Sequence, residues 1–399
     1  MSVDAPHLKA HLSYRKFRKP PYRFICLEYE YFLQDSLINE LRKCGHVVET
    51  LRIEKGMGGK ETLRILLRKA MEVKPDGIIS LNGMGLDNQG QIVTVLSEMT
   101  VPVIIWYLDN HLFNGPYLRD QTPDWAIAFT YERALESSLR EAGFQHVFYL
   151  PLAADPALSE VKKTSNQFDF LSEKISFVGG TFSKAVEDYY QPDFEQIYLE
   201  WQPDFAGYKQ KQGRVEISKI FEPFRDSFSA PETFYRFIAY VIARETFRYR
   251  RDRLICLQNE PIVIYGPEEW REHLGAMDVR GPVAYDTDTP LVYQNSAVNL
   301  SLTTLQQETA LNQRYFDVPL CGGFLLGEWQ ESLSDHFDLD HEIVHFRTDE
   351  ELRGKARYYL RHPEERAAVI NKARTRVLKE HLMKHRVATM LESIKAVCK

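Results

Sequence analysis

Short apolar runs alternate with amphipathic stretches from about residue 22 to residue 150 of the chain. Continuous apolar runs are typical of strands that are buried on both faces of a parallel sheet. In the amphipathic stretches, apolar residues recur every three or four positions, as they do in helices that cover a sheet. The pattern predicts strands at 23–28, 46–53, 76–81, 101–108, 125–129 and 146–150, and helices at 34–44, 60–73, 89–98 and 132–142.

The same rhythm returns after a polar stretch that ends at residue 172, but a region rich in Tyr, Phe, Glu and Arg interrupts it. Strands that alternate with helices indicate a parallel sheet, and right-handed crossovers make that sheet doubly wound. The pattern predicts strands at 174–178, 261–265, 298–301, 324–326 and 342–346, and helices at 215–256, 349–360 and 363–391.

The chain of 399 residues is long for one hydrophobic core, since cores stop growing at roughly 250–300 residues. We therefore expect an α/β protein with two Rossmann-like, doubly wound parallel-sheet domains and a ligand site in the cleft between them. The expected parts are an arm at 1–20, a first domain at 21–157 and a second domain at 158–380, with a helical insertion at about 186–257. A C-terminal helix at 381–399 follows, and it can pack back on the first domain.

The composition and the cysteine pattern argue against several classes of protein. A formal net charge of −6 argues against nucleic-acid binding, which favours a basic surface. No apolar run approaches the ~20 residues of a membrane span, and we expect no signal peptide. The five cysteines are scattered without a C-x-x-C pair, which indicates reduced thiols in a cytoplasmic protein.

A polar segment that leads into a short helix and a double glycine is the most informative part of the second domain. Asn312 and Arg314 lie near the predicted helix start, where free N–H groups attract anions, and Arg offers a forked donor to phosphate. Asp317 is placed to accept hydrogen bonds from ribose hydroxyls, and Gly322 and Gly323 let the backbone approach a ligand. The alternative is a capped helix with a glycine C-cap, a solvent-exposed Arg and a surface Asp.

Several segments together resemble the CgeB-like (spore maturation protein) glycosyltransferases. The C-terminal ones are the most specific, and the matches in the first half are weaker. They are N-Q-R-Y-F-D-V-P-L-C-G-G-F at 312–324, E-I-V-H-F-R-T-D-E-E-L at 342–352, Y-L-R-H-P-E-E-R at 359–366, W-Y-L-D-N at 106–110 and L-P-L-A-A-D-P at 150–156.

The resemblance implies a GT-B architecture, in which the second domain mainly holds a nucleotide diphosphate and the first mainly holds the acceptor. Arg314 would then contact the diphosphate, and Gly322 and Gly323 would bring backbone to the phosphates. Asp317 would stand where related enzymes place a ribose-binding Glu, one methylene longer. The implied reaction moves a hexosyl or N-acetylhexosaminyl group from a UDP- or GDP-linked sugar to a protein, glycan or small-molecule acceptor, without a metal ion.

A second candidate phosphate loop opens the second domain. Gly179, Gly180 and Thr181 directly follow a predicted strand, so their N–H groups can cradle phosphate, with Lys184 as a nearby counter-charge. The alternative is a plain turn between a strand and a helix.

Tyr265 and Gly266 end the next predicted strand and resemble the Y-G-x-x-W of the family, which lies near the nucleotide base. Either Tyr265 or Trp270 can stack on a base there. Packing in the core explains both aromatic residues equally well.

The candidate catalytic residues lie in the first domain. Asp109 ends a strongly apolar strand and His111 follows it, so that either can accept the proton of the acceptor or stabilise a positive centre. Asn82 and Gly83 end the neighbouring strand and can bring backbone close to the acceptor. The alternatives are that Asp109 caps a turn and that Asn82–Gly83 is a tight turn.

No metal site is expected, because Asp286 and Asp288 lie in a polar turn before a proline, and His381 and His385 lack a third ligand. Two other functions on the same scaffold stay open: a non-catalytic protein that binds a nucleotide sugar, and a GT-B-shaped epimerase of sugar nucleotides. The helical insertion either selects the acceptor or forms a homodimer.

Overall fold

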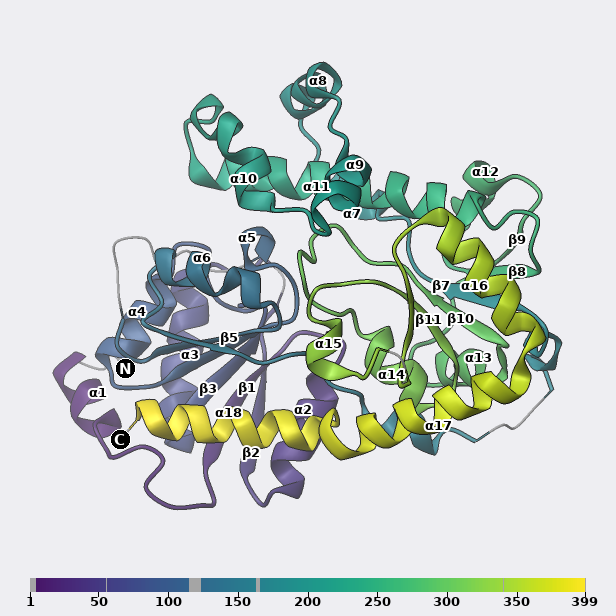
Figure 1. Ribbon diagram of the computed structural model, residues 1–399. Coiled ribbons are helices and arrows are strands. Elements are labelled where there is room, and N and C mark those ends of the chain that lie inside the picture. Colours follow the sequence, from purple (N-terminus) through teal and green to yellow (C-terminus); the bar gives the residue numbers. More distant parts are fainter. Residues whose placement is uncertain (1–4, 55, 115–122, 163–165, 340, 399) are drawn as a thin grey trace. The chain divides into compact units, whose positions relative to one another are not determined.

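The structure is a computed structural model with two compact units (Figure 1). Unit 1 comprises Met1–Pro151 and Met383–Lys399, and unit 2 comprises Leu152–Leu382. Each unit contains a six-stranded sheet whose paired strands are all parallel, which confirms the predicted pair of doubly wound sheets. The residues that the structure describes are 5–54, 56–114, 123–162, 166–339 and 341–398.

The sheet of unit 1 has the strand order β2-β1-β3-β4-β5-β6. The chain moves outward from β1 to β2 and then returns to the other side of β1 for β3, so the direction of winding switches between β1 and β3. In such sheets, ligands bind beyond the carboxyl ends of the strands at this switch point. The strands are β1 (Arg23–Glu28), β2 (Val47–Arg52), β3 (Gly77–Leu81), β4 (Val103–Tyr107), β5 (Ala126–Thr130) and β6 (His146–Tyr149).

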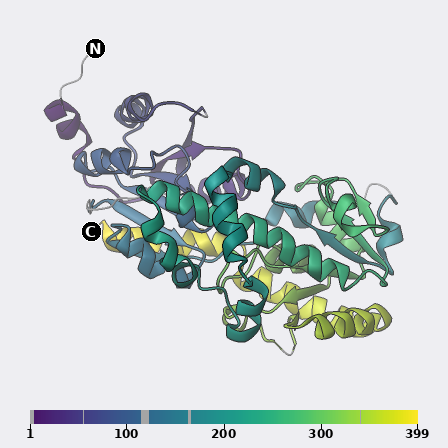
Figure 2. The same cartoon turned by 90° about the horizontal axis from the view of Figure 1, so that it is seen from above.

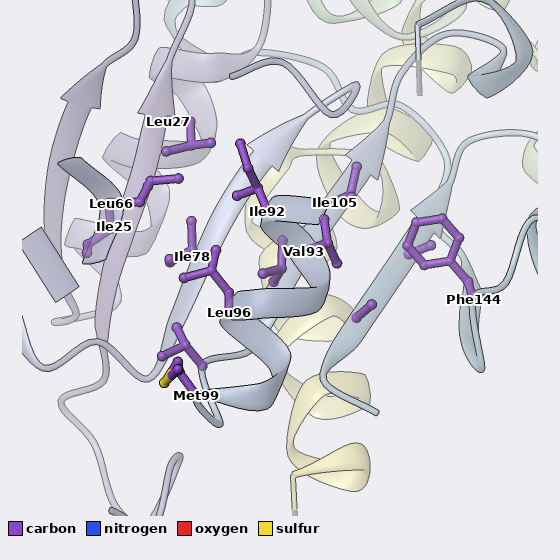
Figure 3. Packing of buried hydrophobic residues seen from close by; sticks show 14 of the residues in the cluster. Ile25, Leu27, Leu66, Ile78, Ile92, Val93, Leu96, Met99, Ile105 and Phe144 are labelled. Carbon is purple, nitrogen blue, oxygen red and sulfur yellow. The ribbon is translucent and has the colours of Figure 1, made fainter. Parts of the chain in front are cut away.

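Helices cover this sheet with their apolar faces. Figure 3 shows Ile92, Val93 and Leu96 of α4 packed near Ile78 and Ile105 of the strands, all of them buried. The C-terminal helix α18 belongs to this unit and packs against α2. The helices are α1 (Ala5–Leu12), α2 (Gln34–Lys43), α3 (Gly59–Val73), α4 (Gln91–Glu98), α5 (His111–Asn114), α6 (Glu136–Glu141) and α18 (Met383–Val397).

The sheet of unit 2 has the strand order β12-β11-β10-β7-β8-β9. Its switch point lies between β7 and β10, because the chain first winds outward through β8 and β9 and then returns to β10. The short edge strand β9 was not predicted, since an Asp-Val-Arg sequence carries almost no apolar signal. The strands are β7 (Ile175–Val178), β8 (Ile262–Tyr265), β9 (Asp278–Arg280), β10 (Val298–Ser301), β11 (Leu325–Glu328) and β12 (Val344–Phe346).

The interruption of unit 2 is helical and contains α7 to α11, with α11 as its longest helix (Figure 2). Residues 215–256 were predicted to be largely helical, and the structure divides them into α10, a 3-10 helix and α11, because Pro223 and Pro231 lack an N–H group and begin new helices. The helices are α7 (Ser183–Tyr189), α8 (Pro192–Trp201), α9 (Phe205–Gln212), α10 (Ile217–Phe221), α11 (Pro231–Ile255), α12 (Trp270–Leu274), α13 (Thr289–Asn295), α14 (Arg314–Leu320), α15 (Leu333–His336), α16 (Asp349–Arg361) and α17 (Pro363–Glu380).

The predicted helix at 363–391 is also divided, into α17 and α18. At the break, the carbonyl of His381 accepts a hydrogen bond from the N–H of Ala154 (2.8 Å), and Ala154 forms a bridge with Leu382. The segment after β6 therefore takes up a carbonyl that the helix would otherwise use. No proline or glycine marks the break, so the apolar pattern alone does not reveal it.

Candidate functional site

Glycines bring two loops together beyond the carboxyl ends of β7 and β8. A Cβ atom on Gly266 would lie 2.3 Å from the carbonyl oxygen of Gly179, so only glycine allows this approach. The Nε1 of Trp270 donates to the same carbonyl (2.9 Å), and the N–H of Gly179 donates to the carbonyl of Tyr265 (2.9 Å). These contacts fix the loop after β7, while a Cβ atom on Gly180 would meet nothing closer than the backbone nitrogen of Phe182, at 4.0 Å.

Arg314 begins α14 and reaches from the β10 side of the switch point to the end of β7. The Oδ1 of Asn312 accepts the N–H of Arg314 (3.1 Å), and the amide of Asn312 donates to Ser301 Oγ (2.9 Å) at the end of β10. A terminal nitrogen of the Arg314 guanidinium donates to the carbonyl of Val178. Its Nε is buried without a hydrogen-bond partner in the described part of the chain. A buried donor without a partner costs about 1–3 kcal/mol, which a ligand that accepts the bond removes.

A second arginine, Arg250 of α11, lies at the same switch point. It is 3% exposed, and it donates to the carbonyls of Gly180 (3.3 Å), Leu302 (3.3 Å) and Thr303 (3.2 Å). Burial, and then the charge of Arg314, lower the pKa of Arg250 to about 9, so that it stays charged at neutral pH. The residues described by the structure include no carboxylate within ion-pair distance of either arginine.

Sequence reasoning missed Arg250, although the sequence holds a signal for it. The residue lies on the stripe of α11 that also carries Ala243, Thr246 and Leu254, all of which are buried. The neighbouring Arg251 is more exposed and pairs with Asp252 (2.7 Å). An arginine in the buried stripe of a helix needs either a partner or a function, since unpaired charges are rarely buried.

The carboxylate of Glu328, at the end of β11, is already engaged. It forms an ion pair with Lys209 Nζ (3.5 Å) and accepts hydrogen bonds from the hydroxyl of Tyr249 and the N–H of Thr303 (3.0 Å). Lys209 also donates to Gln330 (3.0 Å). Through Lys209 and Tyr249, two helices of the insertion are anchored at the edge of the sheet where Arg250 and Arg314 lie.

Three residues that were predicted to bind the nucleotide contact other parts of the protein in the structure. Lys184 lies on the exposed side of α7 and pairs with Asp188 (2.6 Å). Thr181 is buried and accepts a hydrogen bond from the hydroxyl of Ser183 (3.0 Å). Tyr265 packs in an apolar cluster with Phe168, where burial raises its pKa to about 12. Within the described residues, no hydrogen bond or ion pair joins any of these three side chains to Arg314.

Gly322 and Gly323 lie at the opposite end of α14 from Arg314. Because α14 connects the parallel strands β10 and β11, it runs back across the sheet, and the glycines stand before the start of β11. Gly322 ends the helix with a φ of +81°, and a Cβ on Gly323 would lie 2.5 Å from the carbonyl oxygen of Tyr293. The glycines thus serve a turn and close packing, and the structure does not bring them to the candidate phosphate site.

Asp317 lies one turn along α14 and is 1% exposed. Its carboxylate accepts hydrogen bonds from the hydroxyl of Tyr285 (2.7 Å) and from Gln313 Nε2 (2.8 Å). Gln313 also donates to the carbonyl of Ala153 (2.7 Å), in the segment that leads into unit 2. Both oxygens are therefore in use inside the unit, rather than facing a ribose.

The ionisation of Asp317 predicts a pH dependence of stability. Burial raises its pKa from 3.8 to about 7, so the folded state holds this proton more tightly than the unfolded state. The free energy of unfolding then falls as the pH rises from about 4 through 7, by up to roughly 4 kcal/mol. We expect Asp317→Asn to remove this dependence in urea unfolding at pH 4 and pH 8, and the exposed Asp286→Asn to leave it unchanged. An equal loss of stability in the wild type and in Asp317→Asn would contradict the assignment.

In unit 1, polar side chains gather at the switch point between β1 and β3. Asp109, which follows β4, accepts hydrogen bonds from the hydroxyl of Tyr31, after β1, and from Asn82 Nδ2 (3.0 Å), after β3. Asn82 is 1% exposed and also accepts the N–H groups of Leu108 (2.7 Å) and Asp109 (3.0 Å). Burial and the charge of Asp109 raise the pKa of Tyr31, which keeps its hydroxyl protonated.

The turn after β3 shows how Asn82 is held in place. Asn82 and Gly83 both adopt positive φ, +52° and +70°, which asparagine and glycine tolerate best. The tight turn that the sequence left open is therefore present, and the same turn places the Asn82 side chain beside Asp109. Its side chain fixes the backbone of the loop that carries Asp109.

His111 is separate from this cluster. It is 3% exposed, its ring meets the edge of Tyr107 (5.7 Å between centroids), and neither ring nitrogen has a hydrogen-bond partner in the described residues. Burial lowers the pKa of His111 to about 3, so it is neutral at physiological pH. The structure thus joins Asp109 with Asn82 and Tyr31, and Tyr31 is a residue that sequence reasoning missed.

Two kinds of feature are absent from the described part of the chain. No group of three or more His, Cys, Asp or Glu side chains is arranged there to hold a metal ion. None of the helices there combines the length and the apolar character that crossing a membrane requires.

Part of the sequence matches a known protein family. Residues 244–392, which include Arg250, Arg314 and Asp317, match a family described as glycosyl transferase-like. No curated protein matches the sequence significantly. The family match covers the second half of unit 2 and most of α18.

Solved structures share the architecture across nearly the whole chain. A glycosyltransferase from Rickettsia africae is 9% identical, with a TM-score of 0.57, over 97% of this chain and 100% of its own. Anabaena HepE in complex with UDP and glucose is 10% identical, with a TM-score of 0.55, over 94% and 100%. A sucrose-phosphate synthase from Thermosynechococcus elongatus is 9% identical, with a TM-score of 0.57, over 94% and 98%. At such low identity these likenesses concern the fold alone.

Proposed function

We propose that this chain, a glycosyltransferase with the GT-B fold that uses nucleotide sugars, takes its donor as a uridine diphosphate sugar. The observation that carries the proposal is the placement of Arg314 at the switch point of unit 2, with a buried N–H donor that no described residue accepts. A diphosphate supplies the acceptor oxygens and the negative charge that this guanidinium lacks. Support for uridine comes from the fold relative HepE, which was crystallised with UDP and glucose.

The reaction that we propose assigns one task to each unit. In unit 2, Arg314 stabilises the negative charge that develops on the diphosphate as the bond from the anomeric carbon to the phosphate oxygen breaks. In unit 1, the carboxylate of Asp109 accepts the proton of the acceptor hydroxyl as its oxygen bonds to the anomeric carbon. Tyr31 and Asn82 hold that carboxylate in place through their hydrogen bonds.

The direct test is a calorimetric titration with UDP, GDP and uridine, followed by chromatography of UDP-glucose incubated with the protein. We expect UDP to bind more tightly than GDP and uridine, and slow release of UDP from UDP-glucose. Tighter binding of GDP would change the proposed base but keep the diphosphate site. No binding of any nucleotide at millimolar concentration would remove the proposed function.

Transfer without a metal ion is a further part of the proposal. The supporting observation is that the guanidinium groups of Arg314 and Arg250 both lie at the switch point of unit 2, where they can compensate the charge of a diphosphate. Incubation with a chelator should leave the release of UDP unchanged, within twofold. A loss of activity that added Mg²⁺ or Mn²⁺ restores would contradict this part and leave the donor site untouched.

The finer family assignment, to the CgeB-like glycosyltransferases, is also a proposal. It is supported by the motifs at 312–324, 342–352 and 359–366, all of which lie within the matched residues 244–392. An alignment with that family in which Arg314 falls outside the column of its conserved arginine would contradict the assignment.

A cytoplasmic location fits the five cysteines, all of which are free thiols.

A further inference from the structure

Arg250 joins the ends of the two strands that flank the switch point of unit 2. Its guanidinium donates to Gly180 O, in the loop after β7, and to Leu302 O and Thr303 O, after β10. One side chain from the helical insertion thereby sets the spacing of the two loops between which doubly wound sheets bind ligands. Three of the five N–H groups of the guanidinium are used in this way, which leaves two.

Arg250 forms no ion pair in the described part of unit 2, and the attraction of Glu328 offsets less of the cost of its charge than burial and Arg314 add. Its three acceptors are neutral carbonyls, and the nearby Glu328 is engaged by Lys209 and Tyr249. Arg314 adds a like charge close enough to disfavour ionisation of Arg250, beyond the effect of burial. A purely structural link between carbonyls needs donors but no charge, and burying two like charges together is unfavourable. An anion between the loops removes this imbalance.

We infer that Arg250 is a second cationic residue of the diphosphate site, which positions the loops after β7 and β10 and adds its charge to that of Arg314. The ligand class is the pyrophosphate of a nucleoside diphosphate, so this inference rests on the proposed function. It also makes α11, and with it the helical insertion, a part of the donor site.

The test compares UDP with uridine, because only UDP carries the phosphates. Calorimetry gives the ratio of the two affinities for the wild type and for Arg250→Gln, Arg250→Lys and the control Arg251→Gln on the same helix. We expect Arg250→Gln to lower the ratio by about tenfold or more, since a charged hydrogen bond contributes roughly 1.5–3 kcal/mol. Arg250→Lys keeps the charge but loses the fork, and should lower the ratio severalfold. Arg251→Gln should keep the wild-type ratio.

Other outcomes separate this inference from the proposed function. An unchanged ratio in Arg250→Gln, or an equal loss of UDP and uridine affinity, would overturn the inference by reducing Arg250 to a structural residue. If Arg250→Gln does not fold, Arg250→Lys decides, and a ratio within twofold of the wild type overturns it. Failure of the wild type to prefer UDP would instead remove the proposed function. If Arg314→Gln loses the preference for UDP and the Arg250 variants keep it, the proposed function holds but Arg250 has no part in the donor site.

Discussion

Replacing Asp109 with Asn is expected to lower the rate of sugar transfer by about 10²–10⁴-fold, which is the usual contribution of a positioned general base. The variant keeps the size of the side chain and one acceptor oxygen for Tyr31 or Asn82, but an amide cannot take up the proton of the acceptor. Affinity for UDP should stay within about twofold of the wild type, because the diphosphate site that we propose lies in unit 2. Initial rates of UDP release in the presence of an acceptor measure the first effect, and calorimetry measures the second.

Two controls separate chemistry from folding. Asp35→Asn removes an exposed carboxylate from α2 in the same unit and should leave the rate unchanged. Tyr31→Phe removes a hydrogen bond to Asp109 and should lower the rate less than Asp109→Asn does, because the carboxylate itself remains. If Asp109→Asn transfers sugar at the wild-type rate, Asp109 is not the base. If neither protein releases UDP although both bind it, the chain is a non-catalytic binding protein.

Replacing Arg314 with Gln is expected to weaken UDP binding by roughly 10- to 100-fold, while uridine binding changes little. Gln is shorter and neutral, so it cannot supply the forked positive donor at the end of β7. The effect should shrink at high ionic strength, since part of it is electrostatic. Calorimetry at two salt concentrations measures both.

The matched control for this variant is Arg353→Gln, an exposed arginine of α16 in the same unit. It should bind UDP as the wild type does. Equal weakening of UDP and uridine by Arg314→Gln would mean that the side chain supports the fold of the pocket rather than the phosphates. Because Arg314 also bonds the carbonyl of Val178, thermal unfolding of each variant should accompany the titrations.

The apolar rhythm was sufficient to predict two parallel doubly wound sheets, because strands buried on both faces are continuous apolar runs. It also placed Asp109 and Asn82 at strand ends, where the structure joins them by a hydrogen bond. The rhythm does not tell which face of a strand a residue occupies. Tyr265 was for this reason an open choice between base and core, and the structure packs it in the core.

Partners that are distant in sequence were the least predictable. Arg250 lies 64 positions before Arg314 and reaches the same loops only because α11 returns to the sheet. Tyr31 meets Asp109 across 78 positions. The direction of α14 likewise depends on the parallel pairing of β10 and β11, and this direction puts Gly322 and Gly323 at the edge away from Arg314.

The most direct measurement is a crystal structure of the protein grown with UDP. The account predicts a diphosphate beyond the ends of β7 and β10, with a phosphate oxygen within hydrogen-bond distance of Arg314 Nε. A nucleotide bound with its phosphates elsewhere, and with that nitrogen still unpaired, would contradict it.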